Sequence, residues 1–235
     1  MPLTIGILNA DQVRPELAPR FGEYTDMFKR LLCRADSSVV TRNYQVTAGH
    51  YPADIDEVDG YVITGSKYSV YDDEPWIHQL GEFVQTLHAR RKKLVAICFG
   101  HQLVAHVLGG ETAKSKAGWA LGVQHCVITS ALSATVAVGD GMSFLASHQD
   151  QVITLAPGSV TVASSDICPH VMTQLGEHIL TLQWHPEFNA DYVEELLHLR
   201  REQLGDQAIT RALGSLAQPL DNQRFATLAL DFIRR

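Results

Sequence analysis

A cysteine at the end of a predicted buried strand is the first candidate for chemistry in this sequence. Cys98 follows the apolar run 94–97, and from Phe99 onward the apolar spacing is that of a helix. A tight turn from strand to helix lifts such a side chain above the sheet edge, and Gly100 lets neighbouring backbone approach. The helix N-terminus favours a thiolate, and the Phe99 N–H can hold a developing oxyanion. Taken alone, the pattern equally describes a small buried cysteine.

A histidine and a glutamate at the end of a second strand complete the chemistry. The apolar run 179–184 leads into His185, Pro186 and Glu187. Residues two apart in an extended chain point to the same side, and Pro186 favours extended geometry at His185. An imidazole beside the thiol can take its proton, while a carboxylate on the other ring nitrogen fixes the tautomer. The two segments together predict a triad of Cys98, His185 and Glu187.

The elements that must position these residues alternate along the first half of the chain. The apolar runs 3–8, 59–64 and 94–98 are typical of strands buried on both faces. Helical spacing of apolar residues over 24–32 and 77–87 separates them. Strands that alternate with amphipathic helices indicate a doubly wound sheet.

The pattern changes after about residue 119, where short β-rich runs follow one another with little helix between them. These runs are 122–129, 135–138, 152–155, 160–163, 171–174 and 179–184. They predict a mixed or antiparallel extension of the same sheet. A helix over 191–199 with Asn189 as its N-cap, and a last helix over 223–232, close the chain. We expect one domain over 1–235, in which 205–235 forms a peripheral C-terminal segment and helix.

Composition limits the class of protein. The 235 residues are 46% hydrophobic and 19% charged, which is typical of a globular chain. A net charge of -7 gives no general attraction to nucleic acid, and no apolar run reaches the roughly 20 residues of a membrane span. The basic cluster 90–93 suits the end of a helix. We therefore expect neither nucleic acid nor membrane as a partner.

The cysteines and histidines indicate neither a disulfide framework nor a metal site. Four widely spaced cysteines, Cys33, Cys98, Cys126 and Cys168, suit free thiols in a reducing compartment. The N-terminus lacks the pattern of a signal peptide, so the expected location is the cytoplasm. His101 and His106 are five apart and do not face one site. We expect no metal and no cofactor.

Four motifs in order give the sequence a family resemblance. The segment 96–102 resembles a G-x-C-x-G-x-Q elbow, 185–187 is H-P-E, 147–150 is S-H-x-D, and 64–72 resembles S-G-G-P-x-S-V-Y-D. The sequence is similar to the class I (triad) glutamine amidotransferases, most closely to stand-alone proteins that look like the amidotransferase half of GMP synthetase. The resemblance extends to about residue 190.

This resemblance implies a fold and a set of roles. The fold is α/β, a flavodoxin-like doubly wound mixed sheet with helices on both faces. Cys98 would be the nucleophile, His185 the base and acid, and Glu187 the residue that orients His185. The oxyanion hole would use backbone N–H groups of Phe99, Gly65 and Ser66, and the glutamyl group would lie near Gln102, Ser147 and Gln149 in the segments that match the family.

Two departures from the family pattern bear on function. Ala96 replaces the first glycine of the elbow, and Ser66-Lys67 replace Gly-Pro in the oxyanion loop. We expect this loop to be competent without a partner, with Lys67 at the mouth of the site, either solvated or facing a carboxylate of the leaving group. The chain also lacks a synthetase domain and any ATP-binding motif, so it cannot activate an acceptor for ammonia.

These observations predict a cysteine-dependent hydrolase of a small γ-glutamyl amide, either glutamine or another γ-glutamyl compound, acting through a thioester. One alternative is a glutaminase subunit that delivers ammonia to a separately encoded synthetase. A second is a PfpI-like intracellular protease or relative, in which His rather than Phe99 usually follows the cysteine. A regulatory module with a degenerate site is disfavoured because all three triad positions are occupied.

Overall fold

The computed structural model describes residues 2–131 and 136–235. Its strands are β1 (Thr4–Asn9), β2 (Val40–Gln45), β3 (Gly60–Ile63), β4 (Lys93–Ile97), β5 (Glu111–Lys114), β6 (Ala120–Ile128), β7 (Gly141–His148), β8 (Asp150–Thr154), β9 (Ser159–Ser164), β10 (Met172–Leu175) and β11 (Ile179–Leu182). Its helices are α1 (Ala18–Phe21), α2 (Tyr24–Ala35), η1 (Val46–Ala48), α3 (Pro75–Ala89), α4 (Phe99–Val107), α5 (Ala190–Leu199), α6 (Arg201–Leu204), α7 (Asp206–Ser215) and α8 (Asn222–Arg234).

One large mixed sheet organises the described residues. Nine strands lie in the order β2-β1-β3-β4-β11-β10-β9-β6-β7. The pairs from β2 to β11 are parallel, and those from β11 to β7 are antiparallel. Strands β5 and β8 form a separate antiparallel pair. The parallel half with its antiparallel extension confirms the predicted mixed sheet.

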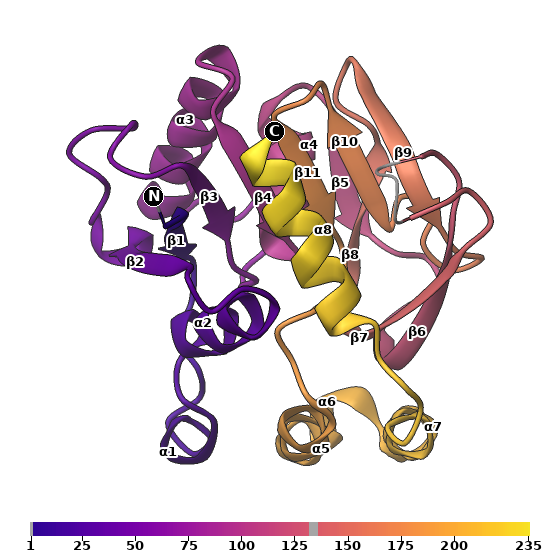
Figure 1. The fold of residues 1–235 in the computed structure, drawn as a ribbon. Coiled ribbons are helices and arrows are strands. Elements are labelled where there is room, and N and C mark those ends of the chain that lie inside the picture. The colour runs from indigo at the N-terminus through magenta and orange to yellow at the C-terminus, as the bar shows by residue number, and fades with distance from the viewer. Residues whose placement is uncertain (1, 132–135) are drawn as a thin grey trace.

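Helices cover both faces of this sheet, as predicted. Alternate residues of the central strands point to opposite faces, so Val62 and Val95 pack in the same cluster as α2 and α8, whereas Ile63 and Leu94 pack with α3 and α4. Figure 1 shows α8 lying across the first of these faces. A third cluster joins α1, α5 and α7 to β6 and β7. The strands that lead to the predicted triad residues therefore belong to a sheet that is packed by helices on both faces.

Three features differ from the sequence-based expectations. The last helix is not peripheral, because α8 buries Phe225, Leu228 and Leu230 against α2 and the sheet. The segment after Gly205 contains α7, whose buried face packs on β6. In the expected strand 135–138, residue 135 lies outside the described residues and 136–138 belong to none of the named strands.

Strand β7 was missed because its sequence mixes small and polar residues with apolar ones. Its polar side chains find partners in the fold: Ser143 Oγ lies 2.7 Å from His125 Nδ1, and Ser147 Oγ accepts a bond from Arg200. Strand β2 was missed as an exposed edge strand with a polar sequence. By contrast, the N-cap prediction for α5 is confirmed, since Asn189 Oδ1 accepts a 2.8 Å bond from the Tyr192 N–H.

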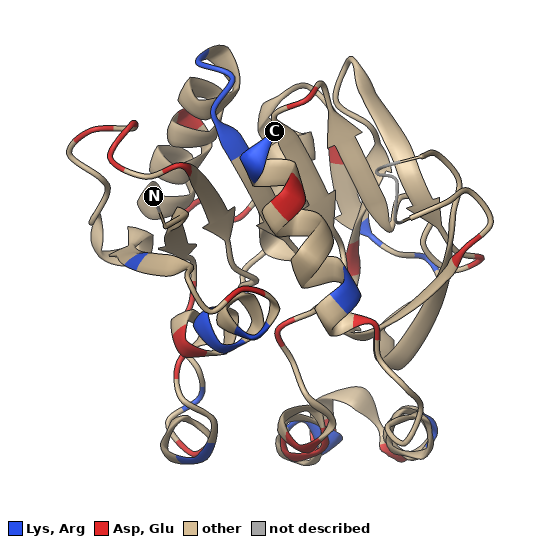
Figure 2. Ribbon diagram, in the orientation of Figure 1, with Lys and Arg blue, Asp and Glu red and all other residues tan. Residues whose placement is uncertain are grey.

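Charged residues lie mainly on the outer helices and loops, and the middle of the large sheet contains few of them (Figure 2). The basic cluster 90–93 follows the last turn of α3, as expected for cations near a helix C-terminus. Within the described part of the chain, none of the helices is both long and apolar enough to cross a bilayer.

Candidate active site

Cys98 occupies a strained turn between β4 and α4. Its backbone has φ 49° and ψ -100°, a conformation that side-chain-bearing residues rarely adopt. Such strain persists only where the surroundings enforce it, commonly at functional sites. Gly100 allows this turn, because a Cβ there would lie 2.8 Å from Ile63 Cβ on the neighbouring strand. The predicted elbow is therefore present, and the Cys98 residue is only 5% exposed.

His185 and Glu187 form a buried pair just beyond β11. His185 Nδ1 lies 2.8 Å from Glu187 Oε1, and the Glu187 side chain has no exposed surface. The backbone N–H of His185 donates to the Leu145 carbonyl, and the imidazole ring stacks on the Phe188 ring with centroids 4.1 Å apart. These contacts fix the ring, so Nδ1 faces the carboxylate and the other nitrogen is left for the thiol.

Cys98 and His185 both pack closely against Gly65. A side chain at Gly65 would place its Cβ 2.7 Å from His185 Cε1 and 3.5 Å from Cys98 Cβ, so only glycine fits beside these two residues. Burial alone would lower the pKa of His185, but the Glu187 carboxylate and the hydrogen-bonded Cys98 side chain outweigh burial and raise the pKa to about 10. The arrangement therefore favours an imidazolium beside the sulfur at neutral pH.

The other buried histidines of this region stay neutral. Burial lowers the pKa of His148 to about 3, although its Nδ1–H donates to the Asp150 carbonyl. Burial likewise lowers the pKa of His101 to about 3, and its Nδ1 lies 2.6 Å from Thr181 Oγ1. Neither residue is suited to proton transfer near neutral pH, in contrast to the raised pKa of His185.

A pocket of about 710 Å³ opens above Cys98. It brings Cys98 together with four of the other predicted site residues, namely Ser66, Gln102, Ser147 and Gln149. Phe99, Gly65, His185 and Glu187 are not among its lining residues. Phe99 follows Cys98 in the chain, and Gly65 packs closely against Cys98.

Gln102 belongs to a hydrogen-bond network under the pocket. Its Nε2 donates to the Asp150 carbonyl at 2.7 Å and to Gln183 Oε1 at 3.2 Å. Gln183 in turn directs its Nε2 at Cys98 Sγ, 3.8 Å away. The amide nitrogen of Gln102 is thus used within the protein. The predicted contact of Gln102 with substrate would therefore use its amide oxygen.

The predicted oxyanion loop is anchored inside this chain. Asp11 accepts bonds from Lys67, at 2.9 Å from the backbone N–H and at 3.0 Å from Nζ. The Ser69 N–H donates to Asp72 Oδ2, and Ser69 Oγ donates to Asp150 Oδ2 at 2.6 Å. Lys67 thus pairs with Asp11 at the pocket, while its side chain stays 69% exposed, in agreement with the expectation of a solvated lysine at the mouth of the site.

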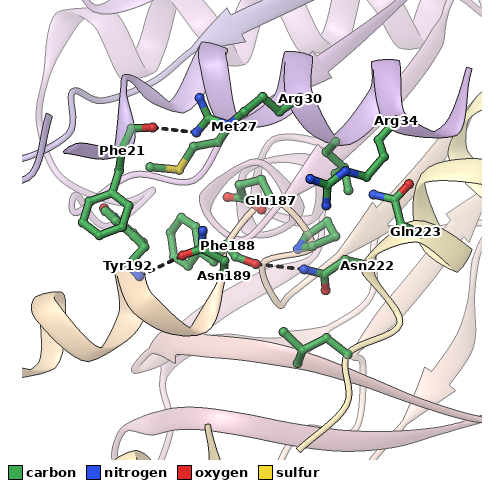
Figure 3. Close-up of a pocket in the computed structure, with 13 residues that line it drawn as sticks. Phe21, Met27, Arg30, Arg34, Glu187, Phe188, Asn189, Tyr192, Asn222 and Gln223 are labelled. Carbon is green, nitrogen blue, oxygen red and sulfur yellow. Dashed lines mark hydrogen bonds between the residues drawn. The ribbon is translucent and has the colours of Figure 1, made fainter. Parts of the chain in front are cut away.

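A second pocket of about 280 Å³ is lined by Glu187 but not by Cys98 or His185. Figure 3 shows Arg30 and Arg34 extending from α2, with Arg30 hydrogen-bonded to the Phe21 carbonyl and Gln223 next to Arg34. Glu187 Oε2 and Asn222 Oδ1 are buried without a hydrogen-bond partner among the residues that the structure describes. Only one carboxylate oxygen of Glu187 is thus engaged, by His185.

Several residues of the large pocket were missed by the sequence analysis. Asp11 and Arg14 follow β1 at the carboxyl edge of the parallel strands, where ligands of open α/β sheets bind, so their position offered a signal. Trp119 and Arg200 offered none, because distant segments bring them to the pocket. Arg200 ends α5, and Trp119 precedes β6.

Comparisons with known proteins agree with this site. Residues 21–196 match the family described as glutamine amidotransferase class-I. The chain is 30% identical over 205 residues to gamma-glutamyl peptidase 3 of Arabidopsis thaliana, with 81% of each chain covered. It is also 30% identical over 169 residues to one of the subunits of the glutamine-hydrolyzing GMP synthase of Archaeoglobus fulgidus, which covers 71% of this chain and 85% of that one.

The fold has solved counterparts as well. A glutamine amidotransferase from Thermotoga maritima superposes with a TM-score of 0.75 at 15% identity, over 100% of this chain and 97% of that one. At this identity the likeness concerns the fold. The family match and the 30% identical relatives confirm the resemblance found in the motifs. The chain belongs to the class I glutamine amidotransferase family and is an enzyme of the amidotransferase and hydrolase type.

Proposed function

We propose that the chain hydrolyses γ-glutamyl amides by itself, with Cys98 as nucleophile, His185 as acid and base, and Glu187 as the residue that orients His185. One observation carries the proposal. The loop 65–72 that would complete the oxyanion hole is held by hydrogen bonds to Asp11 and Asp150 of the same chain, which supports a site that is complete without a partner. The similarity to gamma-glutamyl peptidases supports the same substrate class.

The proposed reaction has two steps. In the first, the Cys98 thiolate attacks the γ-carbonyl carbon, the C–N bond breaks, and the His185 imidazolium gives its proton to the leaving amine. In the second, His185 takes a proton from water as the water oxygen attacks the thioester, and the C–S bond breaks to release glutamate and the Cys98 thiolate beside the restored imidazolium. Backbone N–H groups of Phe99, Gly65 and Ser66 would hold the oxyanion in both steps.

The setting that we propose is the cytoplasm. The four cysteines, Cys33, Cys98, Cys126 and Cys168, are all free thiols in the structure, which supports a reducing compartment. A thiol nucleophile also works best where it is kept reduced.

A second candidate is a glutaminase subunit whose synthetase is a separate chain. The similarity to glutamine-hydrolyzing GMP synthase subunits favours it. The two candidates differ in what the isolated chain does, because a synthetase's glutaminase must restrain glutamine hydrolysis until its partner binds.

The test is turnover by the purified chain alone. We expect hydrolysis of γ-glutamyl peptides without any partner, and loss of this activity in Cys98→Ser. Cys168→Ser is the matched control, since Cys168 is also buried and free but does not line the pocket above Cys98. An inert isolated chain that gains glutaminase activity on addition of a synthetase would contradict the proposal and favour the second candidate.

A further inference from the structure

The pocket above Cys98 carries more positive charge than its own carboxylates balance. Its charged lining residues are Arg14, Lys67, Lys114, Arg200, Asp11 and Asp150. Asp11 is already paired with Lys67. Among the residues that the structure describes, Arg14 and Arg200 form no ion pair, because no carboxylate oxygen lies within 4.0 Å of either guanidinium. This local excess stands in a chain whose net charge is -7.

Arg200 is held rigidly by neutral groups. Its Nη1 donates to Ser147 Oγ at 2.9 Å, its Nε donates to Gln203 Oε1 at 3.4 Å, and its guanidinium lies 4.4 Å from the centroid of the Trp119 ring. These contacts use part of the fork of N–H donors and fix its plane. None of the three partners carries a negative charge, so the positive charge of Arg200 is positioned but not neutralised.

Arg14 also lines this pocket and adds a second positive charge. Burial lowers the pKa of Arg200, and the nearby charge of Arg14 lowers it further. The two guanidinium groups, which both line the pocket, thus repel each other. An anion between them would relieve this repulsion and accept the strong, directional bonds that arginine gives to a carboxylate.

The chemistry of the substrate supplies such an anion. Glutamine carries one ammonium and one carboxylate and has no net charge, whereas a γ-glutamyl amino acid or peptide carries a further carboxylate on its leaving group. The volume of about 710 Å³ lies within the range of about 300–1,000 Å³ usual for pockets that bury a drug-sized ligand.

We propose that Arg200, with Arg14, binds the leaving-group carboxylate and makes the enzyme selective for γ-glutamyl amino acids and peptides over glutamine. This rests on the proposed hydrolysis at Cys98. Both arginines lie outside the segment 21–196 that matches the family, Arg14 before it and Arg200 after it. The two proposed specificity residues thus come from the segments that flank the family match.

The experiment compares substrates that differ only in one carboxylate. γ-Glutamylglycine carries it, γ-glutamylglycinamide lacks it, and a third compound has the glutamyl α-carboxylate of γ-glutamylglycine converted to an amide. Each is tested on the wild type, Arg200→Gln and Arg14→Gln. Arg211→Gln is the matched control, because Arg211 is an exposed arginine of α7 outside the pocket. Values of kcat/KM are measured, and binding is measured on the Cys98→Ala background.

We expect the wild type to prefer γ-glutamylglycine to γ-glutamylglycinamide by about 10- to 100-fold, as for a hydrogen-bonded charge pair. Arg200→Gln should remove most of this preference, mainly through KM, and Arg14→Gln part of it, whereas Arg211→Gln should keep it. Arg14 is exposed, so its variant tests the subsite even if Arg200→Gln folds poorly.

Equal use of the two substrates by the wild type would overturn the subsite and leave the hydrolase intact. A loss in Arg200→Gln that is equal for both, and that disappears only with the third compound, would overturn it by assigning Arg200 to the glutamyl carboxylate. If nothing is turned over but Cys98→Ala still binds γ-glutamylglycine with the arginine-dependent preference, the hydrolase proposal fails and the carboxylate subsite is supported.

Discussion

Replacing Glu187 by Gln should move the alkaline limit of activity to lower pH. The structure pairs the Glu187 carboxylate with His185 at 2.8 Å, in a buried site. Burial lowers the pKa of His185, and the charges of Glu187 and Cys98 raise it above the usual 6.5 to about 10. At about 1.4 kcal/mol per pKa unit, this rise corresponds to roughly 5 kcal/mol in favour of the imidazolium.

The variant keeps the burial and the thiol but loses the carboxylate. A single opposite charge at this distance raises a histidine pKa by about 1–3 units, so we expect the alkaline limb of kcat/KM to fall by about two pH units. At pH 9 the remaining imidazolium, and with it kcat/KM on a γ-glutamyl peptide, should drop about tenfold. His185→Ala should be more damaging, because it removes the proton carrier itself.

The assay is a profile of kcat/KM against pH for the wild type, Glu187→Gln and the control Glu194→Gln. Glu194 also pairs with a histidine, His198, at 4.0 Å, but on the surface. The control should reproduce the wild-type profile. Coincident alkaline limbs in the wild type and Glu187→Gln would refute the electrostatic role of Glu187.

The same pair predicts a pH dependence of stability. The pKa of His185 is raised on folding, so its contribution to stability is complete below the unfolded value near 6.5 and is lost as the pH rises toward about 10. Urea unfolding should therefore show the wild type losing stability between these values, by up to roughly 3–5 kcal/mol, and Glu187→Gln losing much less. A wild type equally stable at pH 6.5 and pH 10 would contradict the raised pKa.

Two further predictions follow from the packing around Cys98. Gly100→Ala should destabilise the fold by about 1–3 kcal/mol in urea unfolding, since its Cβ would lie 2.8 Å from Ile63, whereas Gly214→Ala in α7 meets open space and should be neutral or stabilising. Asp11→Ala should lower kcat by about tenfold or more, because it frees the oxyanion loop at Lys67. Asp73→Asn, an exposed carboxylate paired with His78, should leave kcat unchanged. A normal kcat in Asp11→Ala would show that the loop needs no such anchor.

The triad segments were readable from sequence because their geometry is local. A strand, a cysteine, a glycine and a helix in succession specify the elbow, and extended geometry at His185 sets its distance from Glu187. The alternation of apolar runs likewise predicted the doubly wound half of the sheet. In these cases the chemistry and the backbone pattern lie in one short segment.

The parts that were missed depend on contacts between distant segments. β7 is a strand because β6 pairs with it and because His125 and Arg200 satisfy its serines. The ammonium group of Lys67 pairs with Asp11, which is 56 residues away in the sequence. Neither pairing has a local signature, so a pattern of neighbours along the chain does not reveal it.

The most direct test of hydrolysis through Cys98 is to trap the acyl-enzyme. The purified chain is mixed with a γ-glutamyl peptide, quenched in acid during turnover, and its intact mass and peptide map are measured. We predict a single added glutamyl group on Cys98, absent from Cys98→Ala and accumulating in a variant whose second step is slowed. A glutamyl group on Cys33, Cys126 or Cys168, or turnover by the Cys98→Ala chain, would contradict the central claim.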